Sequence, residues 1–285
     1  MGAALDRWRS WNAAKLPGRA VNRFIRGWSG RLKLEVHRTA CIVTHPPGVS
    51  RNDALINPAN ERLAGTQFSP EECWKELYGD PVNGRWDRDY ATYPFQSVDG
   101  LVTEFGGEEL KLALEAQRAD EHGVRCPVGR AVVTRECGEL NEMFDAIVHV
   151  VPPFFRLAPN PGAWADEMAL TYHAAFDAAQ EAGLATVAVP LLGAGARGAE
   201  LSEAQAQQAA ARAAVSWQTK AHDQESPALV VRFGVQDSTA AHGLADAIHD
   251  AISELAPAAF VSAAAPPKGE ERWALDRTRS QVSST

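Results

Sequence analysis

The most informative stretch of this sequence for its fold is Asp53-Ala54-Leu55-Ile56-Asn57-Pro58-Ala59-Asn60. Its centre, Ala54-Leu55-Ile56, is a short apolar run, and Asn57-Pro58 ends the run with turn-forming residues. This order is typical of a short buried strand followed by a turn.

Similar short runs recur along the chain and alternate with long helical patterns. We expect the other strands at 32–36, 41–43, 131–133, 146–151, 186–189 and 228–233, and helices at 164–182, 202–217 and 239–255. Such alternation predicts a largely parallel or mixed sheet that is covered on both faces. One set of large apolar residues recurs every fourth position and is expected to be core, with no cofactor implied: Trp164, Met168, Tyr172 and Phe176.

The composition is that of a globular protein. The chain has 285 residues, of which 45% are hydrophobic and 22% charged, and it contains no run of about 18 apolar residues that could span a membrane. Its four cysteines are scattered, without a Cys-x-x-Cys pair or a histidine at zinc-finger spacing. We therefore expect neither a metal site nor a disulfide framework, and no cofactor.

Charge is distributed unevenly. Residues 1–40 carry nine basic and two acidic groups, a net +7, so the other 245 residues carry −15 of the total of −8. An acidic body repels polyphosphate, and we expect no nucleic-acid groove on the main domain. The basic arm, residues 1–31, could meet an anionic membrane surface or the machinery of organelle import.

Within this arm, Val21, Phe24, Ile25 and Trp28 have the spacing of an amphipathic helix. Such a helix could be a transit peptide or an interfacial membrane helix, or it could lay its aromatic residues on the domain. We expect an intracellular protein, cytoplasmic by default, with mitochondrial or plastid import as the alternative.

Two further regions depart from the alternation of strands and helices, one inside the domain at 32–255 and one after it. Residues 66–97 are rich in aromatic residues and turn formers, which predicts a long insertion acting as a lid, a binding loop or a small subdomain. The tail at 256–285 is rich in Ala, Pro, Ser and charge, and is expected to be disordered.

The string Gly193-Ala194-Gly195-Ala196-Arg197-Gly198 follows a predicted strand and precedes a predicted helix. Its glycines would let backbone N–H groups approach a phosphate closely, although a tight turn between strand and helix would also explain them. A Rossmann dinucleotide site places such a turn after the first strand. Here only one strand remains after it, which argues against that reading.

Five landmarks, in order, resemble those of the macrodomain family. The stretch 53–60 resembles the motif D-A-I-V-N-A-A-N, and Val98-Asp99-Gly100 resembles V-D-G. The remaining three are the strand entry at 126–134, the strand and turn at 145–153, and the glycine loop at 193–198, which falls on the family's second phosphate loop. The resemblance covers roughly residues 32–255.

The resemblance implies a three-layer α/β/α macrodomain-like fold, with a mixed, largely parallel central sheet and a crevice for ADP-ribose at the carboxyl ends of its strands. It implies ligand contacts from these residues: Ala59, Asn60, Val98, Asp99, Gly193, Ala194, Gly195, Ala196, Arg197 and Gly198. In hydrolytic members, the residues matching Asn60 and Asp99 flank the distal ribose and help a water to attack, without a metal. Asn60 could instead be a turn residue and Asp99 a helix cap.

The chain departs from the family pattern at four places. His45-Pro46-Pro47-Gly48 stands where an acid usually holds the adenine, and residues 61–97 replace a short glycine-rich loop. Arg197 stands where many members carry an aromatic residue, and Pro152 replaces a glycine. Arg197 could pair with a phosphate as a charged donor.

These features lead to two functional expectations. The first is an enzyme that binds ADP-ribose or an ADP-ribosylated protein and hydrolyses ADP-ribosyl or O-acetyl-ADP-ribose linkages. The alternative is a non-catalytic ADP-ribose reader or an interaction scaffold that has lost turnover. His149, in an apolar run, is expected to be a satisfied core histidine.

Overall fold

The computed structural model describes residues 24–29, 32–48, 51–65, 67–68, 85–86, 91–92, 97–198, 201–223 and 229–256. The expected tail at 256–285, apart from Ala256, and most of the basic arm lie outside these residues. Among the residues described, no helix is long and apolar enough to cross a membrane.

A seven-stranded sheet forms the centre of the molecule, in the order β1-β2-β10-β9-β3-β8-β7. Its strands are β1 (Phe24–Ser29), β2 (Leu32–Arg38), β3 (Ala54–Pro58), β7 (Ala131–Thr134), β8 (Ala146–Val150), β9 (Thr186–Val189) and β10 (Val230–Val235). The five inner strands run parallel, and β1 and β7 pair antiparallel at the two edges. The predicted mixed, largely parallel sheet is confirmed.

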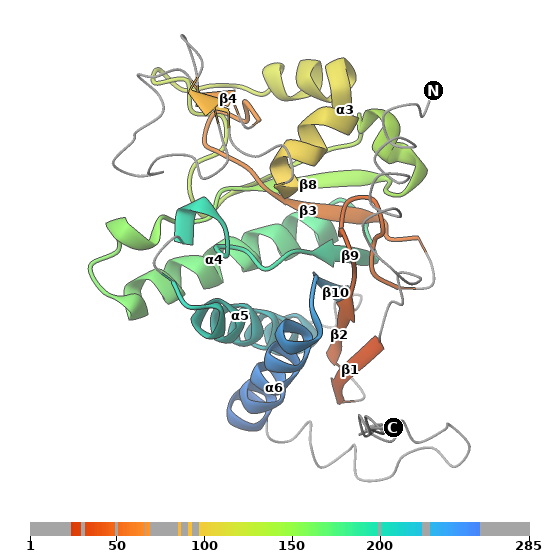
Figure 1. Cartoon of the computed structure of the whole chain (residues 1–285), viewed down its shortest axis with the longest axis vertical. Coiled ribbons are helices and arrows are strands. Elements are labelled where there is room, and N and C mark those ends of the chain that lie inside the picture. Colours follow the sequence, from red (N-terminus) through yellow and green to blue (C-terminus); the bar gives the residue numbers. More distant parts are fainter. Residues whose placement is uncertain are drawn as a thin grey trace, which may run out of the picture.

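Helices cover the two faces of this sheet (Figure 1). On one face lies α3 (Val98–Glu115), together with the short 3-10 helix η1 (Gly138–Glu142). On the other lie α4 (Pro161–Glu181), α5 (Glu203–Asp223) and α6 (Ser238–Leu255), packed side by side. The short 3-10 helices η2 (Phe155–Leu157) and η3 (Ala196–Gly198) follow β8 and β9.

Alternation along the buried strands divides the core in two. Ala54 and Ile56 face the cluster built on α4, α5 and α6, whereas Leu55 faces the cluster built on α3. The α4 stripe of Trp164, Met168, Tyr172 and Phe176 is fully buried, so its predicted place in the core is confirmed. Because successive side chains of a strand point to opposite faces, Asn57 shares the α3 face with Leu55.

The predicted amphipathic helix at 21–28 is wrong. Phe24–Ser29 forms strand β1, which pairs with β2 in the register Phe24↔His37 to Ser29↔Leu32. The spacing of Phe24, Ile25 and Trp28 fits a helix, but an open sheet edge at β2 offers backbone hydrogen bonds that override this local pattern. The predicted strand at 41–43 is also wrong, because these residues form a turn.

Within the insertion at 66–97, the described residues form a separate three-stranded sheet. Its strands are β4 (Gln67–Phe68), β5 (Arg85–Trp86) and β6 (Ala91–Thr92), antiparallel in the order β4-β6-β5. Whether the insertion acts as a lid stays a prediction, since the rest of it lies outside the described residues.

Candidate functional site

The carboxyl ends of β3, β8 and β9 meet the start of α3 at one edge of the sheet. Parallel strands deliver their C-terminal residues to the same edge, which is where open α/β sheets bind ligands. Asn57 and His149 are neighbours in the parallel register of β3 and β8. Asp99 lies in the first turn of α3, so three polar side chains converge at this edge.

A chain of polar contacts joins these residues. Asn57 Nδ2 donates to Asp99 Oδ1 at 2.8 Å and lies 3.2 Å from His149 Nδ1. On the other side of the ring, His149 Nε2 lies 3.0 Å from Thr134 Oγ1. The amide of Asn57 is therefore fixed between a carboxylate and an imidazole.

Burial sets the protonation of both titratable groups. Burial raises the pKa of Asp99 to about 6, although the hydrogen bond from Asn57 and the charge of Arg197 both lower it. Burial lowers the pKa of His149 to about 3, so its ring is neutral at physiological pH. Since Asn57 Nδ2 is a donor, His149 Nδ1 accepts, and Nε2–H is left to donate to Thr134.

One atom of this chain of contacts, Asn57 Oδ1, has no partner among the described residues. Asn57 is 1% exposed, and within the described part of the molecule no donor reaches its Oδ1. An unpaired buried carbonyl is unfavourable by about 1–3 kcal/mol, and native structures rarely leave a buried polar atom without a hydrogen bond. A ligand hydroxyl or a water could supply the missing donor.

Asn60 has a different role from Asn57. Its Nδ2 donates to the carbonyl of Gly65 at 2.6 Å, and its Oδ1 accepts from the backbone N–H groups of Arg62 and Ala64. The side chain thus holds the turn that follows β3. An amide nitrogen carries two hydrogens, so Nδ2 can still donate a second bond.

The glycine loop after β9 has the backbone that a tight turn requires. Gly193 has φ +79°, and a Cβ there would lie 2.8 Å from side-chain atoms of Met168 and Trp164. A Cβ on Gly198 would lie 1.7 Å from the carbonyl oxygen of Gly193, so neither position tolerates a side chain. Gly195 differs, because a Cβ there would meet no atom of the described residues within 4 Å. The loop therefore presents its middle to open space.

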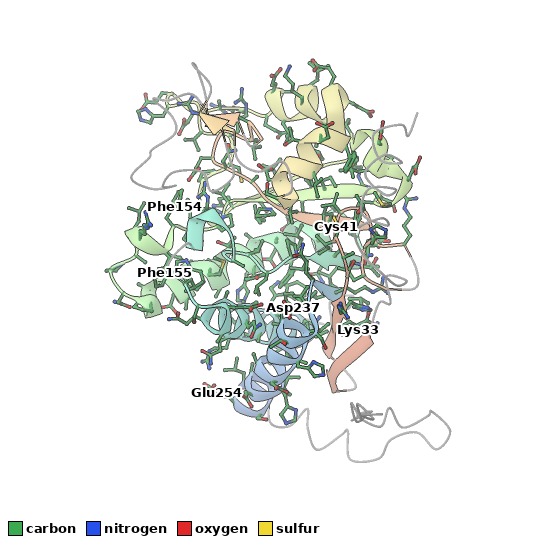
Figure 2. The ribbon with its side chains drawn as sticks, in the orientation of Figure 1. Lys33, Cys41, Phe154, Phe155, Asp237 and Glu254 are labelled. Atoms are coloured by element: carbon green, nitrogen blue, oxygen red, sulfur yellow. The ribbon has the colours of Figure 1, made fainter. Side chains whose placement is uncertain are left out.

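Arg197 fastens this loop to the turn after β3. Its Nη1 and Nη2 pair with the two carboxylate oxygens of Glu61 at 3.1 and 2.6 Å, and Nη1 also donates to the carbonyl of Pro152 at 2.7 Å. The guanidinium lies 4.2 Å from the ring centroid of Phe154. Phe154 and its neighbour Phe155 follow β8 beside α4 (Figure 2). A bidentate pair of this kind fixes orientation as well as charge.

The turn at residues 45–48 contains no carboxylate. Instead, the carbonyl of Pro47 accepts from Asn52 Nδ2 at 2.8 Å. Gly48, with φ +99°, leaves room for the guanidinium of Arg232, which a Cβ would approach to 3.0 Å. Side chains that donate to its backbone, Asn52 to Pro47 and Thr39 to His45, therefore hold the turn that the resemblance matches to the family's adenine-binding segment.

The sequence-predicted residues are only partly brought together. Asp99 and Arg197 lie close enough for their charges to interact, and Asn60 adjoins Glu61, the partner of Arg197. A Cβ added at Gly193 would meet Trp164 and Met168 of α4, and one added at Gly198 would meet the carbonyl of Gly193, whereas one added at Gly195 would meet no described residue. No sequence motif predicted a role in the site for Asn57, Glu61 or Phe154. Side chains alternate between the two faces of a strand, so the sequence could have indicated that Asn57 lies on the same face as Leu55.

Comparisons with known proteins agree with the fold. The family model described as Macro domain matches residues 56–208. A macrodomain of Oceanobacillus iheyensis solved with ADP superimposes with a TM-score of 0.57 at 16% identity, covering 82% of this chain and 98% of that one. The macro domain of ganglioside induced differentiation associated protein 2 gives 0.51 at 17% identity, covering 84% and 96%. No curated protein matched the sequence.

Proposed function

This chain belongs to the Macro domain family, and from that premise we propose that it binds ADP-ribose at the edge formed by β3, β8, β9 and α3, and hydrolyses an ADP-ribosyl or O-acetyl-ADP-ribose linkage there. The macrodomain of O. iheyensis was solved both with ADP and, as a variant, with ADPR. In this chain the proposal is carried by the pair Asn57 and Asp99.

Asn57 and Asp99 offer two acceptors side by side. The carbonyl Oδ1 of Asn57 lacks a donor from the described residues, and the carboxylate of Asp99 receives the amide hydrogen of the same side chain. A ribose diol or a ribose hydroxyl with a water carries the donors that such a pair requires. This buried, half-satisfied arrangement is the observation that supports a sugar ligand.

The glycine loop supports the diphosphate end of that ligand. Gly195 faces open space, and the positive φ of Gly193 turns the chain sharply after β9. Backbone N–H groups of such a turn can approach phosphate oxygens without a side chain between them. Arg197, whose charge is paired with the carboxylate of Glu61, fixes the position of the loop beside this opening.

The proposed reaction uses Asp99 as a general base. With a pKa of about 6, its carboxylate is mostly ionised at pH 7 yet basic enough to accept a proton. Asp99 takes a proton from a water as the water oxygen bonds to the glycosidic or ester carbon. The bond from that carbon to the leaving oxygen breaks, and the leaving oxygen keeps the electron pair. An alkoxide leaving group takes the proton from Asp99, whereas a carboxylate leaves as the anion and Asp99 releases the proton to solvent; both restore the Asp99 carboxylate. Asn57 holds the carboxylate in place, and Asn60 shapes the turn beside the ribose.

A reader module without turnover is the second candidate. It is favoured by Asn60, whose amide already makes three bonds within its own turn. If that amide cannot reach the ribose, the crevice would bind ADP-ribose without positioning its reacting carbon.

The enzyme proposal is tested by release of ADP-ribose from a protein carrying an ADP-ribosyl ester. The full chain should release it, and Asp99→Asn should lower kcat/KM by about 10²-fold or more, the usual contribution of a general base. Asp246→Asn, an exposed aspartate on α6, is the matched control and should act like the unchanged chain. Binding of ADP-ribose with no release by the unchanged chain would favour the reader.

A further inference from the structure

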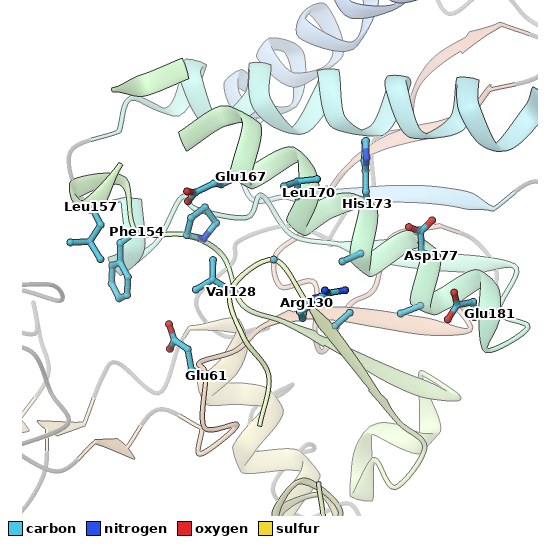
Figure 3. A pocket seen from close by; sticks show the side chains of 15 residues that line it. Glu61, Val128, Arg130, Phe154, Leu157, Glu167, Leu170, His173, Asp177 and Glu181 are labelled. Carbon is cyan, nitrogen blue, oxygen red and sulfur yellow. The ribbon is translucent and has the colours of Figure 1, made fainter. Parts of the chain in front are cut away.

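A groove separate from the crevice runs between α4 and the start of β7 (Figure 3). Its volume is about 1030 Å³, which is ample for several side chains of a bound polypeptide. One wall is the outer face of α4 from Glu167 to Glu181, and the other is the segment 128–131. A helical rise of about 1.5 Å per residue makes the wall about 21 Å long, the reach of roughly six extended residues.

Exposed apolar side chains gather in this groove. Across the described residues, four large hydrophobic side chains are strongly exposed, and three of them line it: Val128 at 42%, Leu157 at 62% and Leu170 at 62%. The fourth, Leu112, lies on α3 on the opposite face of the sheet. Exposed apolar side chains that cluster in a hollow, rather than being scattered, mark an interaction site.

The groove is also acidic. The 21 residues of α4 contain four carboxylates and neither Lys nor Arg. Three of the four line the groove, namely Glu167, Asp177 and Glu181, against the single cation Arg130 on the facing wall. His173 adds no charge near pH 7, because burial lowers its pKa. A bound segment must therefore supply both apolar and positively charged side chains.

One end of the groove adjoins the proposed ADP-ribose site. Glu61 and Phe154 line it, and these are the two side chains that hold Arg197 in the crevice. A polypeptide lying along α4 would therefore lead directly to the ribose end of that crevice.

We propose that this groove binds a basic segment with interspersed apolar residues in the ADP-ribosylated protein partner, an inference that rests on the function proposed above. The modified side chain enters the crevice past Glu61, while lysine or arginine residues of the same segment meet Glu167 and Glu181. Leu157 and Leu170 contact its apolar residues. The groove thereby selects the protein part of the substrate, and the crevice its ADP-ribose.

The probe is a fluorescein-labelled, unmodified peptide of eight residues alternating lysine with leucine or alanine, added to the full chain at low salt. We expect saturable binding, weakened at least tenfold by Leu170→Asp and by Glu167→Lys combined with Glu181→Lys. Matched controls on α3, Leu112→Asp and Glu108→Lys, should leave binding unchanged, since both side chains are similarly exposed away from the groove. A peptide with glutamate in place of lysine should not bind.

Equal loss of binding in the groove and control variants would overturn the proposal. So would a second result, in which the unchanged chain does not bind the peptide but gains binding when the arm residues Arg7, Arg9, Lys15, Arg19 and Arg23 become glutamine. The arm itself would then be the occupant. Binding of ADP-ribose, measured in parallel, separates the two proposals: peptide binding without ADP-ribose binding defeats only the proposed function, and the reverse defeats only the groove.

Discussion

Asn57 Nδ2 donates a 2.8 Å hydrogen bond to Asp99 Oδ1, linking the end of β3 to the first turn of α3. This bond opposes the effect of burial on the carboxylate, whose pKa nevertheless rises to about 6. The contact places a weakly basic carboxylate at the edge of the sheet where we propose that ADP-ribose binds, and the amide of Asn57 influences the pKa of that carboxylate.

Asn57→Ala should raise the pKa of Asp99 further, because the variant lacks the hydrogen bond that favours the ionised form. The acidic limb of the rate profile should move to higher pH, so the loss of kcat/KM should be larger at pH 6 than at pH 8. The check is kcat/KM for ADP-ribosyl ester hydrolysis across this range. Asn141→Ala, an exposed site, should leave the limb where it is, and an unshifted limb in Asn57→Ala would count against the assignment.

Asp99→Asn should stabilise the fold at neutral pH. The pKa of Asp99 is raised from 3.8 to about 6, so the folded state holds its proton more tightly than the unfolded chain does. Ionisation therefore lowers stability as pH rises from about 4 to 6, by about 3 kcal/mol once complete. Urea unfolding at pH 7.5 should show a gain approaching that size for the variant. The gain should fade towards pH 4, and a gain that does not depend on pH would contradict this origin.

Two alanine substitutions in the glycine loop should separate folding from binding. Gly198→Ala should lower the melting temperature, since its Cβ would lie 1.7 Å from the backbone oxygen of Gly193. Gly195→Ala should leave the melting temperature unchanged, because the added Cβ meets no atom in the part of the chain that the structure describes. It should still weaken ADP-ribose binding by about tenfold if phosphate approaches the loop there. Unaltered affinity in a folded Gly195→Ala protein would exclude that contact.

Glu61→Ala should destabilise the chain because it removes the carboxylate from a guanidinium that is 9% exposed. The expected loss in free energy of unfolding is about 1.5–3 kcal/mol, typical of hydrogen bonds to charged groups. Asp145→Ala, which breaks the exposed pair of Arg51 and Asp145, should cost much less. Chemical denaturation of both variants measures the difference, and equal losses would show that the Arg197 contact adds little.

Much of the fold could be predicted from the sequence because its buried strands are short apolar runs with turn residues at their ends. Ala54-Leu55-Ile56 is such a run, and the residues of β3 from Ala54 to Ile56 are fully buried. The stripe from Trp164 to Phe176 follows helical spacing and packs into the core as expected. In both cases the local pattern and the tertiary environment favour the same structure.

The errors arise where partners distant in sequence decide the outcome. Phe24–Ser29 becomes a strand because β2 lies beside it, which no local spacing reveals. Asn57 gains its role from Asp99, 42 residues away, and Arg197 from Glu61, 136 residues away. The motif at 53–60 indicated where the proposed site lies, but the pairing of its side chains depends on how α3 and the glycine loop approach that edge.

Binding of ADP-ribose is tested most directly by a calorimetric titration of the full chain with this ligand. We predict saturable heat with one ligand per chain, weakened by Gly195→Ala and retained by the control Asp246→Asn. Absence of heat at millimolar ADP-ribose, from protein whose melting shows it to be folded, would contradict the account.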